Sequence, residues 1–287
     1  MLRTFAPVVL WALALAAPAQ AAEPAPDCTG YIERAPAKID QPGTWCLAND
    51  ISYMGNLGSA ILVEADDATV DCTQHKIIGN GGGHVTSHGV HLSARRGVTV
   101  KNCYITGFQY GVIAIGDGGR GNVIEDNRVV GNHFVGIYAA GDHSIVQRNE
   151  VSDTGGATFS PLALGIMTKG SVDIIDNTVA GVVGGGEGNG SAFGIDTSLN
   201  DGGVISGNRV REIVPGGSGS AYGIYNASPG WVVVRENDVA GPHAGPGIGL
   251  RCADSKGLVQ GNAVGGFATP SVGCRDAGDN SYLAPSP

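Results

Sequence analysis

The sequence predicts an all-β solenoid, in which the chain winds through a stack of short, parallel coils. Three observations indicate this class: the composition, a recurring phrase built around glycine, and a recurring phrase built around asparagine. Glycine provides 48 of the 287 residues, yet apolar residues still make up 42% of the chain. Such a chain can bury a core, but glycine interrupts it too often for helices, so we expect short strands and many turns.

The glycine phrase consists of a glycine, an aliphatic residue and a few strand-like residues, as in "GIYA" from Gly136. It recurs at intervals of 22 to 29 residues, a length that suits one coil of two or three short strands. The copies begin at Gly89, Gly111, Gly136, Gly165, Gly194, Gly223 and Gly247, and Ala60 occupies the same place in an earlier copy.

The asparagine phrase, aliphatic-x-x-Asn-x-aliphatic, follows each glycine by 12 to 16 residues, and both aliphatic positions are β-branched in every copy. Stacked coils lie about 4.8 Å apart, so these positions would form continuous columns inside the solenoid. Stacked asparagines at a corner would hydrogen-bond one another and the backbone. The column consists of Asn127, Asn149, Asn177, Asn208, Asn237 and Asn262, with Cys103 in an earlier copy.

These phrases resemble the repeats of the right-handed parallel β-helix proteins of the pectate-lyase-like superfamily. The stretch "CLANDISYMGNLGSAILVEADDATVDCTQHKIIG" also resembles the opening coils of many exported bacterial members. The resemblance covers about Trp45 to Gly266. It implies a single-stranded right-handed parallel β-helix of about 8–9 coils with an N-terminal cap. The expected parts are a signal peptide at 1–21, a cap and first coil at 22–59, the β-helix at 60–274 and a flexible tail at 275–287.

The first 21 residues are predicted to be a secretory signal. Arg3 precedes an apolar stretch from Phe5 to Ala17, and Ala19-Gln20-Ala21 is a small-x-small cleavage site. The apolar stretch is shorter than the about 20 residues that cross a bilayer, so we expect a secreted or periplasmic protein without membrane insertion.

The chain has six cysteines, an even number that suggests three disulfides in an exported protein. In the coil geometry of the resembled family, cysteines one coil apart are able to bridge neighbouring turns. The expected pairs are Cys28–Cys46, Cys72–Cys103 and Cys252–Cys274. Six buried thiols are the alternative.

Three successive coils carry insertions between the asparagine and the next glycine phrase. This segment is 9 residues long after Asn127 but 16, 17 and 15 residues long after Asn149, Asn177 and Asn208. We expect the three stacked loops to form one wall of a cleft. The alternative is sequence drift, because long surface loops cost little stability. The inserts cover about 153–164, 180–193 and 212–222.

On each glycine strand, the second residue after the glycine is expected to point outward, because the aliphatic residue before it points inward. Tyrosine offers a sugar an apolar face and a hydroxyl, and lysine and arginine suit the carboxylate of an acidic sugar. An ordinary solvent-facing sheet is the alternative. The first outward row is Leu62, His91, Ile113, Tyr138, Met167, Asp196, Tyr225 and Gly249, and the next is Glu64, Ser93, Ile115, Ala140, Lys169, Ser198, Ala227 and Arg251.

These rows supply the candidate site residues. The expected substrate-binding residues are His91, Tyr138, Met167, Asp196, Tyr225 and Arg251. Turn residues that would border the same groove are Asp117, Arg120, Asp142 and His143. A metal site is a further candidate at His75, His84, His88 and His91, and Ca²⁺ is a possible cofactor at Asp66, Asp67 and Asp71.

The formal charge of −9 argues against nucleic acid as a partner. The resemblance suggests a protein that acts on or binds an acidic polysaccharide containing uronic acid. In a lyase-like β-elimination, Lys169 or Tyr138 would be the base, and Arg251 would clamp the carboxylate. The Gly-His-Gly and Asp-Pro-His signatures of the superfamily's hydrolases and epimerases are missing, so a lyase ranks above a glycoside hydrolase. The alternatives are a non-catalytic glycan-binding or envelope-structural β-helix and a periplasmic, metal-associated protein of the copper-delivery type.

Overall fold

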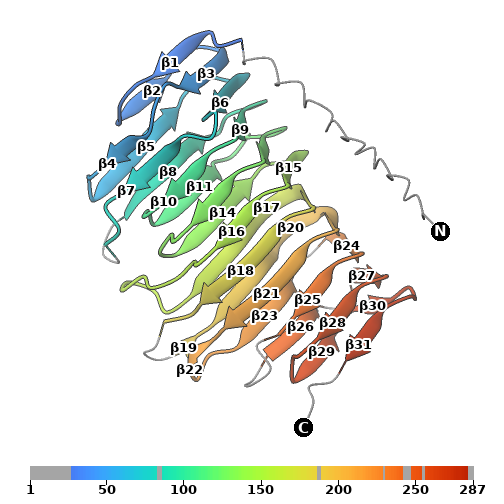
Figure 1. Ribbon diagram of the computed structural model, residues 1–287. Helices are drawn as coiled ribbons and strands as arrows, with labels where there is room; N and C mark the ends of the chain where they lie inside the picture. The colour runs from blue at the N-terminus through green and yellow to red at the C-terminus, as the bar shows by residue number, and fades with distance from the viewer. Residues whose placement is uncertain are drawn as a thin grey trace, which may run out of the picture.

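A computed structural model describes residues 27–82, 86–185, 189–228, 230–241, 247–253 and 256–283. Across these residues the chain is a right-handed parallel β-solenoid of about eight turns, which confirms the predicted fold class. Figure 1 shows strands of successive coils lying side by side along one axis. The described part contains no helix with the length and apolar character that crossing a membrane requires. The signal peptide predicted at 1–21 lies outside the described residues.

A typical coil contributes three strands: the glycine strand β14 (Val135–Ala140), then β15 (Ser144–Gln147), then β16 (Glu150–Ser152) after the asparagine. First and second strands form one 19-stranded sheet, because β17 (Ala163–Ile175) and β20 (Ala192–Ser206) run through both positions. Third strands form a separate 10-stranded sheet.

The other strands fall into the same three positions. In the first position lie β2 (Ala37–Ile39), β5 (Leu57–Val63), β8 (Thr86–Ser93), β11 (Tyr110–Ile115), β23 (Ala221–Asn226), β26 (Gly247–Cys252) and β29 (Thr269–Val272). In the second lie β1 (Gly30–Ile32), β3 (Gly43–Leu47), β6 (Ala68–Asp71), β9 (Thr99–Lys101), β12 (Val123–Glu125), β24 (Trp231–Arg235), β27 (Gly257–Gln260) and β30 (Arg275–Asp276). In the third lie β4 (Ile51–Tyr53), β7 (Lys76–Gly79), β10 (Tyr104–Thr106), β13 (Arg128–Val130), β18 (Thr178–Val183), β21 (Arg209–Val214), β25 (Asp238–Ala240), β28 (Ala263–Gly265) and β31 (Ser281–Leu283).

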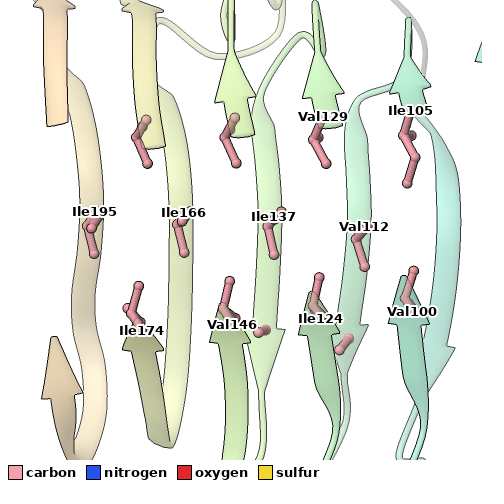
Figure 2. Packing of buried hydrophobic residues seen from close by; sticks show 14 of the residues in the cluster. Val100, Ile105, Val112, Ile124, Val129, Ile137, Val146, Ile166, Ile174 and Ile195 are labelled. Atoms are coloured by element: carbon pink, nitrogen blue, oxygen red, sulfur yellow. The ribbon is translucent and has the colours of Figure 1, made fainter. Parts of the chain in front are cut away.

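Columns of β-branched side chains fill the interior. Figure 2 shows one column of Val112, Ile137, Ile166 and Ile195, a second of Val100, Ile124, Val146 and Ile174, and part of a third with Ile105 and Val129. Each of these side chains is at most 1% exposed. Both columns predicted around the asparagine are therefore internal, and each coil covers the apolar surface of its neighbour.

The glycine of each phrase is required by packing. A Cβ atom at Gly194 would lie 2.6 Å from the carbonyl oxygen of Gly223 in the next coil and would overlap Cγ1 of Val210 across the core. Close-packed interiors leave no room for such an atom. A glycine is therefore needed at this position so that the valine two residues after the asparagine can pack against it.

The predicted register is wrong in the last copy of the glycine phrase. In β26, Leu250 aligns with Ile224 and Arg251 with Tyr225, so Gly249 rather than Gly247 continues the glycine column. The phrase "GIGL" contains two glycines in alternation, and only pairing with the preceding strand distinguishes them. As a result, Arg251 lies in the first outward row instead of the second.

The asparagine corner, which is the stack of turns from Asn127 to Asn262, has the predicted structure. Asn177 is 1% exposed. Its Oδ1 accepts hydrogen bonds from the backbone nitrogen and Nδ2 of Asn149 at 2.9 and 3.0 Å, and its Nδ2 donates to the carbonyl of Val146 at 2.9 Å. Its backbone nitrogen donates to Oδ1 of Asn208 at 2.9 Å. Every coil thus satisfies the polar groups of the next.

The solenoid continues further toward both ends than the sequence suggested. Asn280 extends the corner by accepting from the backbone nitrogen of Asn262 at 2.9 Å. Strands β30 and β31 lie within the segment expected to be a flexible tail, and they pair with β27 and β28. Strands β1 and β2 also pair in parallel with β3 and β5, and a separate N-terminal cap stays a prediction. The three predicted disulfides are confirmed: Cys28–Cys46, Cys72–Cys103 and Cys252–Cys274.

The inserted segments are only partly loops. Strands β18 and β21 extend to Val183 and Val214, and the paired side chains of Val182 and Ile213 are buried. Beyond them, β19 (Asn189–Gly190) and β22 (Gly216–Gly217) form a short antiparallel ladder that ties the second and third inserts together. The first residues of these two inserts therefore enlarge the core, and the outer parts project from one edge.

Candidate functional site

A cavity of about 570 Å³ lies beside the glycine face, which is the outward side of the glycine strands. It is found where the strands of successive coils pass into turns at residues 94–98, 116–122 and 141–143, and we call this boundary the turn edge. Tyr138, Ile115 and Ala140 line it from β14 and β11. Its charged lining consists of Arg96, Asp117, Arg120, Asp142, Lys169 and Asp201.

Stacked turns position these charges. Arg120 forms parallel backbone bridges with Arg96 in the preceding coil and with Asp142 in the following coil, so the three residues follow one another at about the 4.8 Å spacing of strands. Oδ1 of Asp142 accepts a hydrogen bond from the backbone nitrogen of Ser171 at 3.0 Å. Gly116 has a φ of 99°, a conformation that glycine adopts without strain.

The cations at the turn edge are free to meet a ligand. Lys169 and Arg120 are exposed, and neither forms an ion pair within the described part of the chain. Nε of Arg96 donates to the carbonyl of Gly118 at 3.2 Å, which orients its guanidinium. Lysine and arginine donate to carboxylates, whereas aspartates accept from hydroxyls. This lining therefore suits a ligand that carries both hydroxyl and carboxylate groups.

Tyr138 is half-buried in the cavity wall. Burial, and secondly the carboxyl group of Asp196, raises the pKa of the Tyr138 phenol. The phenol is then protonated at neutral pH, so it is better suited to donate a proton than to act as the base that the sequence suggested.

The predicted catalytic residues do not form one group. Tyr138 and Lys169 line the turn-edge cavity. Arg251 lies on β26, three coils away from β17, the strand of Met167 and Lys169, and its guanidinium is 5.6 Å from the ring centroid of Tyr225. Lys169 keeps its predicted place opposite Ala140, but a register shift after Met167 puts Leu199 instead of Ser198 next in that row. Arg120, which the sequence placed only at the border, shares this cavity with Lys169.

Asp196 occupies an unusual position for an outward-facing carboxyl group, since it is only 7% exposed. It lies in register between Met167 and Tyr225, and its Oδ1 accepts a hydrogen bond from the backbone nitrogen of Ser198 at 2.8 Å. Burial raises its pKa. It therefore lies on the glycine face between the turn-edge cavity and the aromatic side chains of the following coils.

Several aromatic residues on the glycine face were missed by the sequence reasoning. Phe193 stacks on Tyr222 with centroids 4.8 Å apart, and both contact Tyr225. Tyr110 contacts Phe134 at 5.6 Å. The available signal was the residue directly before the glycine, which is only partly buried in four of the coils although strict alternation would place it inside. That position is aromatic or histidine at His88, Tyr110, Phe193 and Tyr222.

The four histidines proposed for a metal site are not brought together. His75 lies beside Asp50, with Nδ1 and Oδ1 3.3 Å apart, whereas His88 and His91 lie on the glycine face. His84 falls outside the described residues. Within the described ranges, no three histidine, cysteine or acidic side chains converge on one point.

The acidic residues suggested for Ca²⁺ serve the backbone instead. Oδ1 of Asp66 accepts from the backbone nitrogen of Arg96 at 3.0 Å, and Oδ1 of Asp71 accepts from that of Thr73 at 2.9 Å. Asp67 occupies a turn with a φ of 53°. Capping of turns accounts for Asp66 and Asp71.

Comparison with known proteins identifies the class. The family model described as "Right handed beta helix region" matches residues 59–264, so the chain belongs to this family. Among solved structures, it is similar to the catalytic domain of GH87 α-1,3-glucanase in complex with nigerose, with 13% identity and a TM-score of 0.35. The match covers 88% of this chain and 52% of that one, so the chain spans about half of the glucanase domain. No curated protein sequence matches the chain significantly.

Proposed function

We propose that this protein binds an acidic polysaccharide along the glycine face, with a uronate carboxylate held at the turn edge. The observation that carries the proposal is the pair Lys169 and Arg120, two exposed cations that form no ion pair among the described residues and share a cavity with a half-buried tyrosine. Unpaired cations at this site offset the negative net charge of the chain where a carboxylated sugar would lie. The three disulfides are compatible with a protein that works outside the cytoplasm.

The same residues favour β-elimination as the reaction, should the bound chain be cleaved. Lys169 in its neutral form would remove the proton on the carbon beside the carboxylate, and Arg120 would neutralise that carboxylate. Breaking the bond to the glycosidic oxygen forms a carbon–carbon double bond. The protonated phenol of Tyr138 would then supply the proton that the leaving oxygen needs. Arg120 replaces Arg251 in this scheme, because Arg120, unlike Arg251, lines the cavity with Lys169.

A binding panel tests the proposal. Polygalacturonate, alginate and chondroitin oligosaccharides are titrated into the protein beside a neutral glucan, while ultraviolet absorbance reports unsaturated products. At least one acidic oligosaccharide should bind, and Lys169→Ala should weaken that binding about 5- to 30-fold, as the loss of one charge-assisted contact implies. Arg128→Ala, on the 10-stranded sheet, is the matched control. Equal binding of acidic and neutral oligosaccharides would contradict the proposal, and binding without product would restrict it to recognition.

A further inference from the structure

Two histidines at the N-terminal end of the glycine face point a ring nitrogen at the same atom. His88 and His91 lie on β8, and Ser59 lies on the adjacent strand β5, directly opposite His88. The Oγ atom of Ser59 is 3.4 Å from Nδ1 of His88 and 3.4 Å from Nδ1 of His91. Both imidazoles therefore direct their Nδ1 atoms toward the space around the Ser59 hydroxyl.

The packing does not explain this arrangement as a structural one. A histidine that serves structure normally uses its nitrogens in good hydrogen bonds, but these contacts are at the limit of hydrogen-bonding distance. Nε2 of His91 is buried and has no hydrogen-bond partner in the described part of the chain.

The separation of the rings matches a shared ion. Metal–nitrogen bonds to imidazole are about 2.0–2.1 Å, which places each ring centroid about 3.2 Å from the ion and two centroids about 4.5–5.2 Å apart at bond angles near 90–110°. The observed separation is 5.0 Å, with the ring planes at 80°. Tyr110 packs edge-on against His88 at 5.5 Å and fixes that ring from the other side.

We propose that His88 and His91 bind a divalent transition-metal ion, with Cu²⁺ preferred, through their Nδ1 atoms. Imidazole is a ligand for copper, zinc and nickel, and among divalent ions of the first transition row Cu²⁺ binds nitrogen sites most strongly. The hydroxyl of Ser59 lies next to the ion, and solvent completes its coordination, since no third histidine, cysteine or acidic ligand converges on this region in the described ranges. The site is separate from the turn-edge cavity, which neither histidine lines.

Titration of Cu²⁺ into tag-free protein, followed by calorimetry and electron paramagnetic resonance, tests this assignment without any glycan. Wild type should bind one ion per chain, with hyperfine splitting from two equatorial nitrogens. His88→Gln and His91→Gln keep a polar side chain of similar reach, and each should weaken binding at least about tenfold and remove one nitrogen from the spectrum.

His143→Asn is the matched control, because His143 is exposed in a turn with a φ of 58° that asparagine tolerates. It should bind Cu²⁺ as wild type does. The assignment is overturned if either glutamine variant, with an unchanged melting temperature, binds Cu²⁺ as tightly as wild type. It is also overturned if the wild-type spectrum shows no nitrogen from imidazole.

Discussion

The asparagine corner and the turn edge are two margins of the same coils, but they use their polar residues in opposite ways. At the corner, the side chain of Asn177 meets neighbours in the coils on both sides, and its polar groups are buried and satisfied. At the turn edge, Lys169 and Arg120 are exposed without ion pairs in the described part of the chain. The difference indicates that the corner stabilises the solenoid, whereas the edge is free to vary for binding.

If the corner carries stability, its loss should produce the largest effect. Asn177→Leu removes the side-chain bonds to Asn149, Asn208 and the Val146 carbonyl, and it leaves the backbone nitrogen of Asn149 and the Val146 carbonyl without these partners. At about 1–3 kcal/mol for each of these two groups, we expect the free energy of unfolding to fall by about 2–6 kcal/mol in urea denaturation. Asn56→Leu removes one hydrogen bond at an exposed position, from Nδ2 of Asn80, and should change it by at most about 1 kcal/mol. Similar values for the two variants would show that the ladder is not the source of stability.

The glycine column should come next in size. Gly194→Ala places a Cβ against the Gly223 carbonyl and Val210, and overpacking of this kind typically costs about 1–3 kcal/mol. Gly202→Ala lies on the same strand, where the nearest atoms to a Cβ are 3.5 Å away, so it should be nearly neutral. Thermal unfolding of both variants checks the difference, and a stable Gly194→Ala protein would show that the glycine strands repack easily.

A smaller effect is expected from the buried carboxyl group between the two margins. The raised pKa of Asp196 means that the folded state holds this proton more tightly than the unfolded chain does. The associated stability is present below the unfolded pKa, about 3.9, and is lost as pH rises through the higher folded-state pKa. Asp196→Asn retains an acceptor for Ser198 but does not ionise. Wild type should therefore lose stability relative to this variant between pH 3.5 and 7 in urea denaturation, whereas a pH-independent difference would contradict the assignment.

The same contrast explains what the sequence was able to predict. The corner repeats one residue type at one position, so Asn127 to Asn262 revealed the fold, the inward columns and the approximate coil length. The turn edge has no residue repeated from coil to coil throughout, because two arginines and an aspartate, Arg96, Arg120 and Asp142, fill equivalent turns. Register there depends on pairing between coils. A shift after Met167 therefore displaced Ser198 from its predicted row, and the double glycine at Gly247 and Gly249 displaced Arg251.

The aromatic residues were missed for a related physical reason. Counting back from the inward aliphatic residue, strict alternation places the residue before the glycine inside. This count fails where the glycine and the aliphatic residue after it both face inward. In β8, both Gly89 and Val90 are buried while His88 and His91 point outward. The two consecutive inward positions are a property of the folded coil. They place His88 and His91 on the same outward side, whereas strict alternation would place them on opposite sides.

The central claim is that the turn edge, and not the rest of the solenoid, recognises an acidic glycan. Calorimetric titration of an acidic oligosaccharide into two charge-reversed proteins tests it most directly. Arg120→Glu with Lys169→Glu changes the turn edge, and Arg128→Glu with Arg209→Glu makes the same change of charge on the 10-stranded sheet. We predict that the first protein loses at least about 30-fold in affinity, in line with two lost charge-assisted contacts, at an unchanged melting temperature, while the second binds as wild type does at physiological salt. Equal losses in the two proteins would contradict the account.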